Sequence, residues 1–265
     1  MLISVAGQSQ ELYVFSEPAS NMPAKSMGAK ISTIFGKGYH GENMYRLQPE
    51  VQFGFNKNFM LHIGTTVSNM YTPSSQWESV YLYGKYRFLS VDDMHKHFRM
   101  AAFGEVSHSR NEYHFEEVNI TGDRSGFQVG LIATQLVNKL AVSATVSHTQ
   151  AMDPTRYDRV VYNPKPTYSS LNYSLSAGYL VLPFEYKSYD QLNMNIYLEL
   201  LGQQTLDRKT FYWDLAPALQ FIIGSNTKLN LGYRTQLKSD QFRSMQKSFL
   251  IAVEHTFFNA LKKKN

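Results

Sequence analysis

The chain has 265 residues and a formal net charge of +5, and aromatic residues make up 14% of it although its mean hydropathy is only −0.34. It contains no apolar run approaching the roughly twenty residues that a membrane-spanning helix needs, and stretches such as 179–184 are far shorter. The absence of cysteine excludes disulfides and thiolate metal sites, and the scattered positive charge gives no basic face, so we expect no nucleic-acid partner.

The beginning of the chain is typical of an exported protein. Residues 1–7 are apolar, end in small residues and resemble the end of a secretory signal peptide, so we expect a residual signal there. Residues 8–24 follow, and Tyr13, Phe15, Pro18 and Pro23 make them too aromatic for an ordinary flexible terminus. We expect a periplasmic or lumenal segment that either lies in the interior as a short plug or docks a periplasmic partner.

Apolar and polar residues alternate from about residue 25 to residue 258, as in half-buried strands. In the second segment Leu47, Val51 and Phe53 share one face, whereas Arg46 and Glu50 share the other. Each run can cross a bilayer as a tilted strand. The pattern predicts about twelve strands, near 25–35, 44–56, 59–69, 77–89, 97–108, 124–136, 139–150, 169–182, 191–203, 211–223, 227–238 and 247–258.

The connections between these strands fall into two classes. Those after even strands are mostly short, such as 137–138 and 224–226, whereas most of those after odd strands are long, such as 109–123 and 151–168. This division is the signature of outer-membrane barrels. The predicted fold is therefore all-β: a transmembrane antiparallel up-and-down β-barrel over 25–258 with periplasmic termini and a basic tail over 259–265, located in the outer membrane of a Gram-negative bacterium.

A soluble β-sandwich also alternates, but its strands are about half as long. Aromatic residues near the strand ends favour the membrane alternative, because they are typical of interfacial girdles. The residues assigned to these girdles are Trp77, Tyr81, Tyr83, Tyr86, Phe88, Tyr212 and Trp213. Pro49 and Pro217 fall inside predicted strands, where we expect bulges or local errors of register.

Charged residues on the polar face are the candidates for lining the lumen. They are Arg46, Glu50, Lys85, Arg87, Arg99, Glu105, Glu199, Asp214, Lys228, Arg234 and Glu254. Such charges could form a selective constriction, or they could pair with one another and fill the interior. Both signs occur in similar number, which favours the packed network slightly. A barrel of twelve strands is intermediate in size between small barrels filled by side chains and large barrels with an aqueous channel.

Two other chemistries have weaker support. His95 and His97 follow Asp92 and Asp93 at a turn, where residues two apart face the same side and could chelate Zn²⁺ or Cu²⁺, although such short motifs arise often by chance. A lipid-modifying hydrolase would need a Ser–His pair at the outer rim of the membrane. Neighbouring residues such as Ser147 and His148 point to opposite faces and form no local dyad. We expect no enzyme activity and no cofactor.

The longest predicted loop, 151–168, is rich in Tyr, Arg and Pro. It could contact a partner protein or a glycan, because Tyr and Arg are enriched in binding hot spots. It could also fold inward and close the lumen, or it could be a variable surface loop without a function.

The segments 11–26, 95–104, 130–136 and 253–259 resemble uncharacterised outer-membrane barrels of the Bacteroidota over nearly the whole chain. The resemblance implies an integral outer-membrane protein and supplies no catalytic residue. We expect a narrow channel or transporter for a small solute, surrounded by outer-membrane lipid and lipopolysaccharide. The alternative is a non-conducting accessory subunit bound to other outer-membrane or periplasmic proteins.

Overall fold

A computed structural model describes residues 13–94, 96–152, 167–183 and 191–262. Its strands confirm the twelve predicted from the alternation, with ends that differ by no more than four residues. They are β1 (Ser26–Lys37), β2 (Asn43–Gly54), β3 (Phe59–Ser68), β4 (Gln76–Asp92), β5 (Lys96–Ser109), β6 (Gly126–Val137), β7 (Leu140–Ala151), β8 (Ser169–Leu182), β9 (Asn193–Thr205), β10 (Phe211–Ile223), β11 (Thr227–Ser239) and β12 (Lys247–Phe257).

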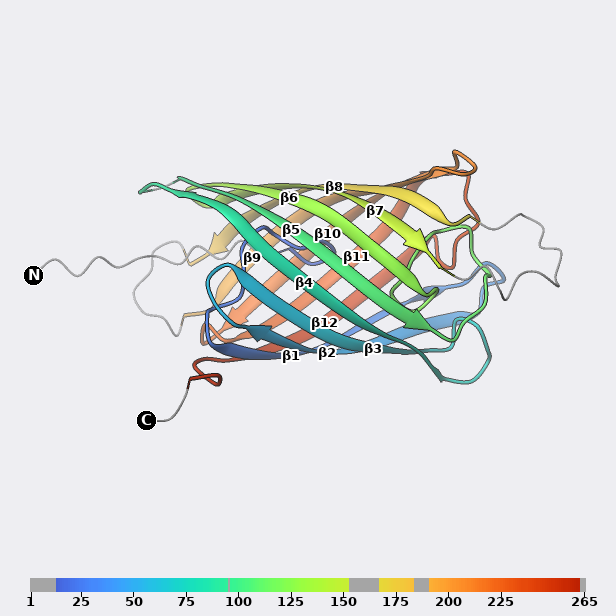
Figure 1. Ribbon diagram of the computed structural model, residues 1–265, viewed down its shortest axis with the longest axis horizontal. Coiled ribbons are helices and arrows are strands. Elements are labelled where there is room, and N and C mark those ends of the chain that lie inside the picture. Colours follow the sequence, from blue (N-terminus) through green and yellow to red (C-terminus); the bar gives the residue numbers. More distant parts are fainter. Residues whose placement is uncertain (1–12, 95, 153–166, 184–190, 263–265) are drawn as a thin grey trace, which may run out of the picture.

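The strands form one closed antiparallel barrel in which each pairs with its neighbours in sequence, and β12 returns to β1 (Figure 1). Met27 pairs with Phe257, so the start of β1 and the end of β12 lie at the same end of the barrel. The short turns after β2, β6 and β10 lie at that end, which is the periplasmic end in outer-membrane barrels. Within the described residues no helix is long and apolar enough to cross a bilayer.

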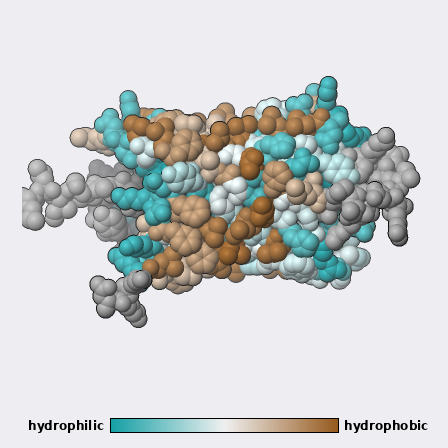
Figure 2. All heavy atoms as spheres, in the orientation of Figure 1, coloured by the Kyte–Doolittle hydropathy of each residue, from teal (hydrophilic) through white to brown (hydrophobic). Residues whose placement is uncertain are grey.

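The outer surface carries an apolar belt. Along β12, Phe249 and Ile251 are exposed to 50% and 43%, whereas Leu250 and Ala252, which alternate with them, are buried. Figure 2 shows hydrophobic residues across the middle of the barrel and hydrophilic residues at both ends. A closed barrel satisfies every ladder hydrogen bond internally, and with this belt it meets the requirements for spanning a bilayer.

The predicted aromatic girdle is wrong at three positions. Trp77, Tyr86 and Phe88 are exposed as expected, but Tyr81, Tyr83 and Tyr212 are buried and face the interior. The reason is the alternation itself, because Tyr81 and Tyr83 share the parity of Lys85 on β4 and cannot face the lipid if Lys85 faces the lumen.

The two strand prolines produce no bulge. The register between β2 and β3 is the same on both sides of Pro49, and the register between β10 and β11 is the same on both sides of Pro217. Each proline pairs regularly with its other neighbour, Ile31 on β1 or Leu198 on β9, so the missing N–H interrupts the ladder on one side only. The register of β10 shifts at Trp213 instead.

Candidate functional site: two segments inside the lumen

The predicted charged residues surround a lumen in which most of them already have partners. Lys85, Glu199 and Asp214 are buried almost completely, Lys228 pairs with Glu254 at 2.6 Å, and Arg87 is half-buried. Other charges of the set contact two chain segments that enter the barrel, and these segments determine what the interior can do.

The first segment is residues 13–24, which we call the strap. Glu199 of β9 anchors it: Oε1 accepts the backbone N–H groups of Val14 and Phe15, each at 2.9 Å, and Oε2 accepts the hydroxyl of Ser16 at 2.6 Å. The Ser16 hydroxyl also lies 2.9 Å from that of Ser176 on β8. Tyr13 packs edge-on against Tyr197 of β9 at 5.6 Å between ring centroids.

The strap then crosses to the opposite part of the wall. The backbone N–H of Ala19 donates to Thr134 of β6. The ammonium group of Lys85 on β4 donates to the carbonyls of Pro18 and Ser20 at 2.7 and 2.8 Å and lies 3.3 Å from Glu17. Burial alone would raise the pKa of Glu17, but Lys85, His62 and Lys30 together outweigh it and lower that pKa. Arg99 of β5 also donates to the hydroxyl of Ser20 at 2.8 Å. The sequence had left open whether this segment is lumenal, and residues 13–20 contact side chains of at least five strands, β4, β5, β6, β8 and β9.

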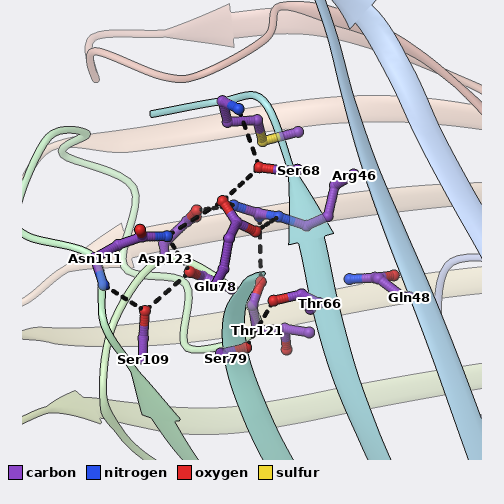
Figure 3. A network of polar contacts seen from close by, with 12 residues as sticks. Arg46, Gln48, Thr66, Ser68, Glu78, Ser79, Ser109, Asn111, Thr121 and Asp123 are labelled. Atoms are coloured by element: carbon purple, nitrogen blue, oxygen red, sulfur yellow. Dashed lines mark hydrogen bonds and ion pairs between the residues drawn. The ribbon is translucent and has the colours of Figure 1, made fainter. Parts of the chain in front are cut away.

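The second segment is residues 110–125 between β5 and β6, which we call the inner loop. Figure 3 shows one of its attachments, in which Arg46 of β2 lies between Glu78 of β4 and Asp123 of the loop. Arg46 is 2.7 Å from Glu78 and also donates to the carbonyl of Thr121. Burial raises the pKa of Asp123 although Arg46 opposes this shift.

A second attachment joins the inner loop to the far wall. Glu117 lies 3.2 Å from Arg243, in the β11–β12 loop, and 3.5 Å from Arg234 of β11. Both guanidinium groups also bind Asp214 of β10, at 2.7 and 2.5 Å, and Arg243 lies over the ring of Tyr212. Burial would raise the pKa of Glu117, but the two cations outweigh it and hold this pKa at about 2.

Further contacts hold the inner loop at other points of the wall. Glu116 pairs with Arg208, in the β9–β10 turn, at 2.5 Å and accepts the backbone N–H of Phe242. Thr121 donates to Glu105 of β5 at 3.0 Å. The inner loop is thus attached to side chains distributed around the barrel.

A chamber of about 360 Å³ lies inside the barrel and is lined by residues of both segments. The strap contributes Phe15, Ser16 and Glu17, and the inner loop contributes 117–120. Strands β4 to β11 supply the walls. This volume falls within the roughly 300–1,000 Å³ that small-molecule sites occupy.

The sequence did not reveal the inner loop or Arg243 as parts of this site. The loop has an ordinary polar composition, and Glu117 and Arg243 are 126 residues apart. The one signal in the sequence was the pair of adjacent acids at 116–117, which have no basic residue beside them and could pair with the arginines predicted in the lumen. The loop predicted as a possible plug, 151–168, lies largely outside the described residues.

The other two candidate chemistries gain no additional ligand or catalytic group. His97 Nδ1 is 2.7 Å from Asp92, which also binds Arg99 at 3.1 Å, and His95 lies outside the described residues. Within the described ranges no three acidic or histidine side chains come together as a metal site. His148 Nε2 is 2.9 Å from the hydroxyl of Ser169 at the outer rim, but no carboxylate in the part that the structure describes orients its other nitrogen.

No protein-family model and no curated protein sequence matches the chain. Solved structures do match in fold. The COG4313 outer-membrane channel from Pseudomonas putida F1 is similar with a TM-score of 0.61 at 10% identity, over 92% of this chain and 100% of that one. The β domain of the Bordetella autotransporter BrkA has a TM-score of 0.53 at 12% identity, over 88% and 99% of the two chains. The KdgM porin has a TM-score of 0.51 at 9% identity, over 87% and 99%.

At these identities the likeness concerns the fold alone. The apolar belt and the closed barrel with short turns at one end provide the independent argument for the location. The chain is an integral β-barrel of the outer membrane of a Gram-negative bacterium.

Proposed function

We propose that the chain is a gated channel that lets a small polar solute cross the outer membrane, with the strap as the periplasmic gate and the inner loop as the outer constriction. The observation that carries the proposal is how the strap is attached. In the described part of the chain no backbone–backbone hydrogen bond joins residues 13–24 to a strand, and the contacts run through side chains such as Glu199, Thr134 and Lys85.

An attachment of this kind can be released without breaking the barrel. The twelve strands hold one another through continuous ladders, whereas the strap is held by side-chain hydrogen bonds worth about 0.5–3 kcal/mol each and by the packing of Tyr13 and Ala19 against the wall. Segments of low local stability are those that move in gating and binding. The fold shared with the Pseudomonas putida channel and the KdgM porin is consistent with this function.

The second candidate is a non-conducting accessory subunit of an outer-membrane assembly. The dense pairing of Arg46, Glu117 and Arg243 favours it, because ion pairs that fill an interior stabilise a closed barrel without serving transport. The two candidates differ in one property: whether release of the strap opens a path for ions.

A disulfide lock separates them. The chain has no cysteine, and the hydroxyls of Ser16 and Ser176 are 2.9 Å apart, so the double variant Ser16→Cys, Ser176→Cys places two thiols within bonding reach. A matched control disulfide, Thr205→Cys with Thr210→Cys, lies in the β9–β10 turn, where the hydroxyls are 2.7 Å apart and do not touch the strap. Single-channel conductance in planar bilayers is then recorded before and after reduction.

We expect few or no openings of the oxidised strap variant and discrete conductance steps after reduction, whereas the control pair conducts equally in both states. Equal conductance of the oxidised and reduced strap variant would exclude the strap as the gate. A folded protein that stays silent after reduction and after deletion of residues 13–22 would overturn the channel and favour the accessory subunit.

A further inference from the structure

We infer that the chamber between the strap and the inner loop binds an uncharged saccharide of one or two rings. The inference rests on the proposed function, because it names the class of solute that this channel would carry. Three observations lead to it: the composition of the walls, two hydroxyl groups without partners, and the balance of charge.

The walls combine an aromatic side with a side rich in amides and hydroxyls. Tyr83 of β4 and Phe103 of β5 pack against each other at 5.5 Å between centroids, and Phe15 of the strap also lines the chamber. A pyranose ring has apolar C–H faces that can cover such rings, and aromatic side chains contribute large apolar contact areas.

The amide side consists of two groups of hydrogen-bonded side chains, one of Gln128 and Ser147 and one of Thr149, Asn172 and Gln203. Gln128 of β6 donates to Ser147 of β7 at 2.7 Å, Asn172 of β8 donates to Thr149 at 2.7 Å, and Gln203 of β9 donates to Asn172 at 2.7 Å. All five residues line the chamber. Side-chain amides and hydroxyls both donate and accept, as do the hydroxyl groups of a sugar, so this wall matches the polar rim of a saccharide.

Two hydroxyls of the lining have no hydrogen-bond partner within the described residues. The side chain of Tyr83 is buried, with 7% of the residue exposed, and its Oη is unpaired. The Oγ1 of Thr145, on β7, is also buried and unpaired. A buried polar atom without a partner costs free energy, and a bound hydroxyl compound that reaches both atoms would remove that cost.

The balance of charge in the chamber disfavours an anion. The described lining contains three carboxylates, Glu17, Glu105 and Glu117, and a single cation, Arg234. Arg234 is already held by Asp214 at 2.5 Å. Glu17 and Glu117 are compensated by Lys85 and Arg243, whereas Glu105 has Thr121 as its hydrogen-bond partner and no ion pair within the described residues. An acidic sugar or a phosphate would meet this carboxylate and no unpaired cation of the lining, whereas a neutral saccharide meets donors and acceptors without that penalty.

Calorimetry on the full-length refolded protein tests this inference independently of conduction. The detergent must have no sugar headgroup, and the probes are glucose, maltose and glucuronate. Tyr83→Phe and Thr145→Val each remove one unpaired hydroxyl while keeping the packing. Thr66→Val is the matched control, because this buried hydroxyl of β3 bonds to Ser79 and does not line the chamber.

We expect glucose or maltose to bind at least tenfold more tightly than glucuronate. Each chamber variant should weaken the neutral sugar by about five- to tenfold, the effect of one lost hydrogen bond, and Thr66→Val should leave it unchanged. No heat of binding for either neutral sugar, or tighter binding of glucuronate, would overturn the inference even if the channel conducts. Saccharide binding by a protein that never conducts would support the site and overturn the proposed transport.

Discussion

Val118 in the inner loop and Gln203 on β9 hold each other through two reciprocal hydrogen bonds, although 85 residues separate them. The backbone N–H of Val118 donates to Oε1 of Gln203 at 2.9 Å, and Nε2 of Gln203 donates back to the carbonyl of Val118 at 3.0 Å. The side-chain amide of Gln203 thus pairs with the backbone of Val118 as a neighbouring strand would. This contact holds the inner loop, which leaves the barrel between β5 and β6, against the wall at β9.

Replacing Gln203 by Leu is therefore expected to loosen the inner loop. Both buried groups of Val118 lose their partner, so local opening should become easier by about 1–3 kcal/mol, and the Val118 amide should exchange its hydrogen correspondingly faster. Gln220→Leu is the control, because Gln220 contacts Asn195 and Asn230 and not the loop. Unchanged exchange at Val118 in the Gln203 variant would mean that the ion pairs alone hold the loop.

The strap should depend on Glu199 in the same way. Glu199→Leu removes the acceptor for Val14, Phe15 and Ser16, and a buried donor left without its partner costs about 1–3 kcal/mol. We expect the amides of Val14 and Phe15 to lose their protection from exchange while the ladder amides of β9 keep theirs. If the ladder amides lose protection as well, Glu199 supports the barrel and is no specific anchor of the strap.

The limits of the sequence prediction have a physical origin. Strand positions follow from alternation, which lipid on one side and polar interior on the other impose on every strand, so all twelve were predicted to within a few residues. The same alternation would have placed Tyr83 in the lumen if it had been applied consistently along β4. The position of the inner loop could not be predicted, because Glu117 and Asp123 acquire their roles from Arg243 and Arg46, which only the closed barrel brings near.

Lys85 offers a test of how strongly a buried cation holds the strap. Lys85→Met leaves the carbonyls of Pro18 and Ser20 without this donor and Glu17 without its nearest cation. Lys85 is fully buried, whereas Glu17 is 38% exposed, so the loss falls mainly on the two carbonyls, and a hydrogen bond to a charged group is worth about 1.5–3 kcal/mol. We expect a lower urea midpoint for strap release, followed through a fluorophore on Ser20→Cys. Lys228→Met, which affects a pair with Glu254 away from the strap, should leave that midpoint unchanged, and equal midpoints for wild type and Lys85→Met would refute the role of Lys85.

Acid should release the inner loop through Glu117. Its pKa is held at about 2 because Arg243 and Arg234 outweigh the effect of burial, whereas an unfolded glutamate titrates near about 4.3. A lowered pKa gives stabilisation that is fully present above the unfolded value and is lost as pH falls toward the folded value, here between about 4.3 and 2. The shift corresponds to about 3 kcal/mol. The opening equilibrium of the loop, obtained from hydrogen exchange after division by the intrinsic exchange rate at each pH, should therefore rise steeply in that window, as should the conductance of the reduced strap variant. Glu117→Gln should abolish this rise between about pH 4.3 and 2, because the amide cannot titrate. A rise of the same size in that variant would assign the acid response to another group.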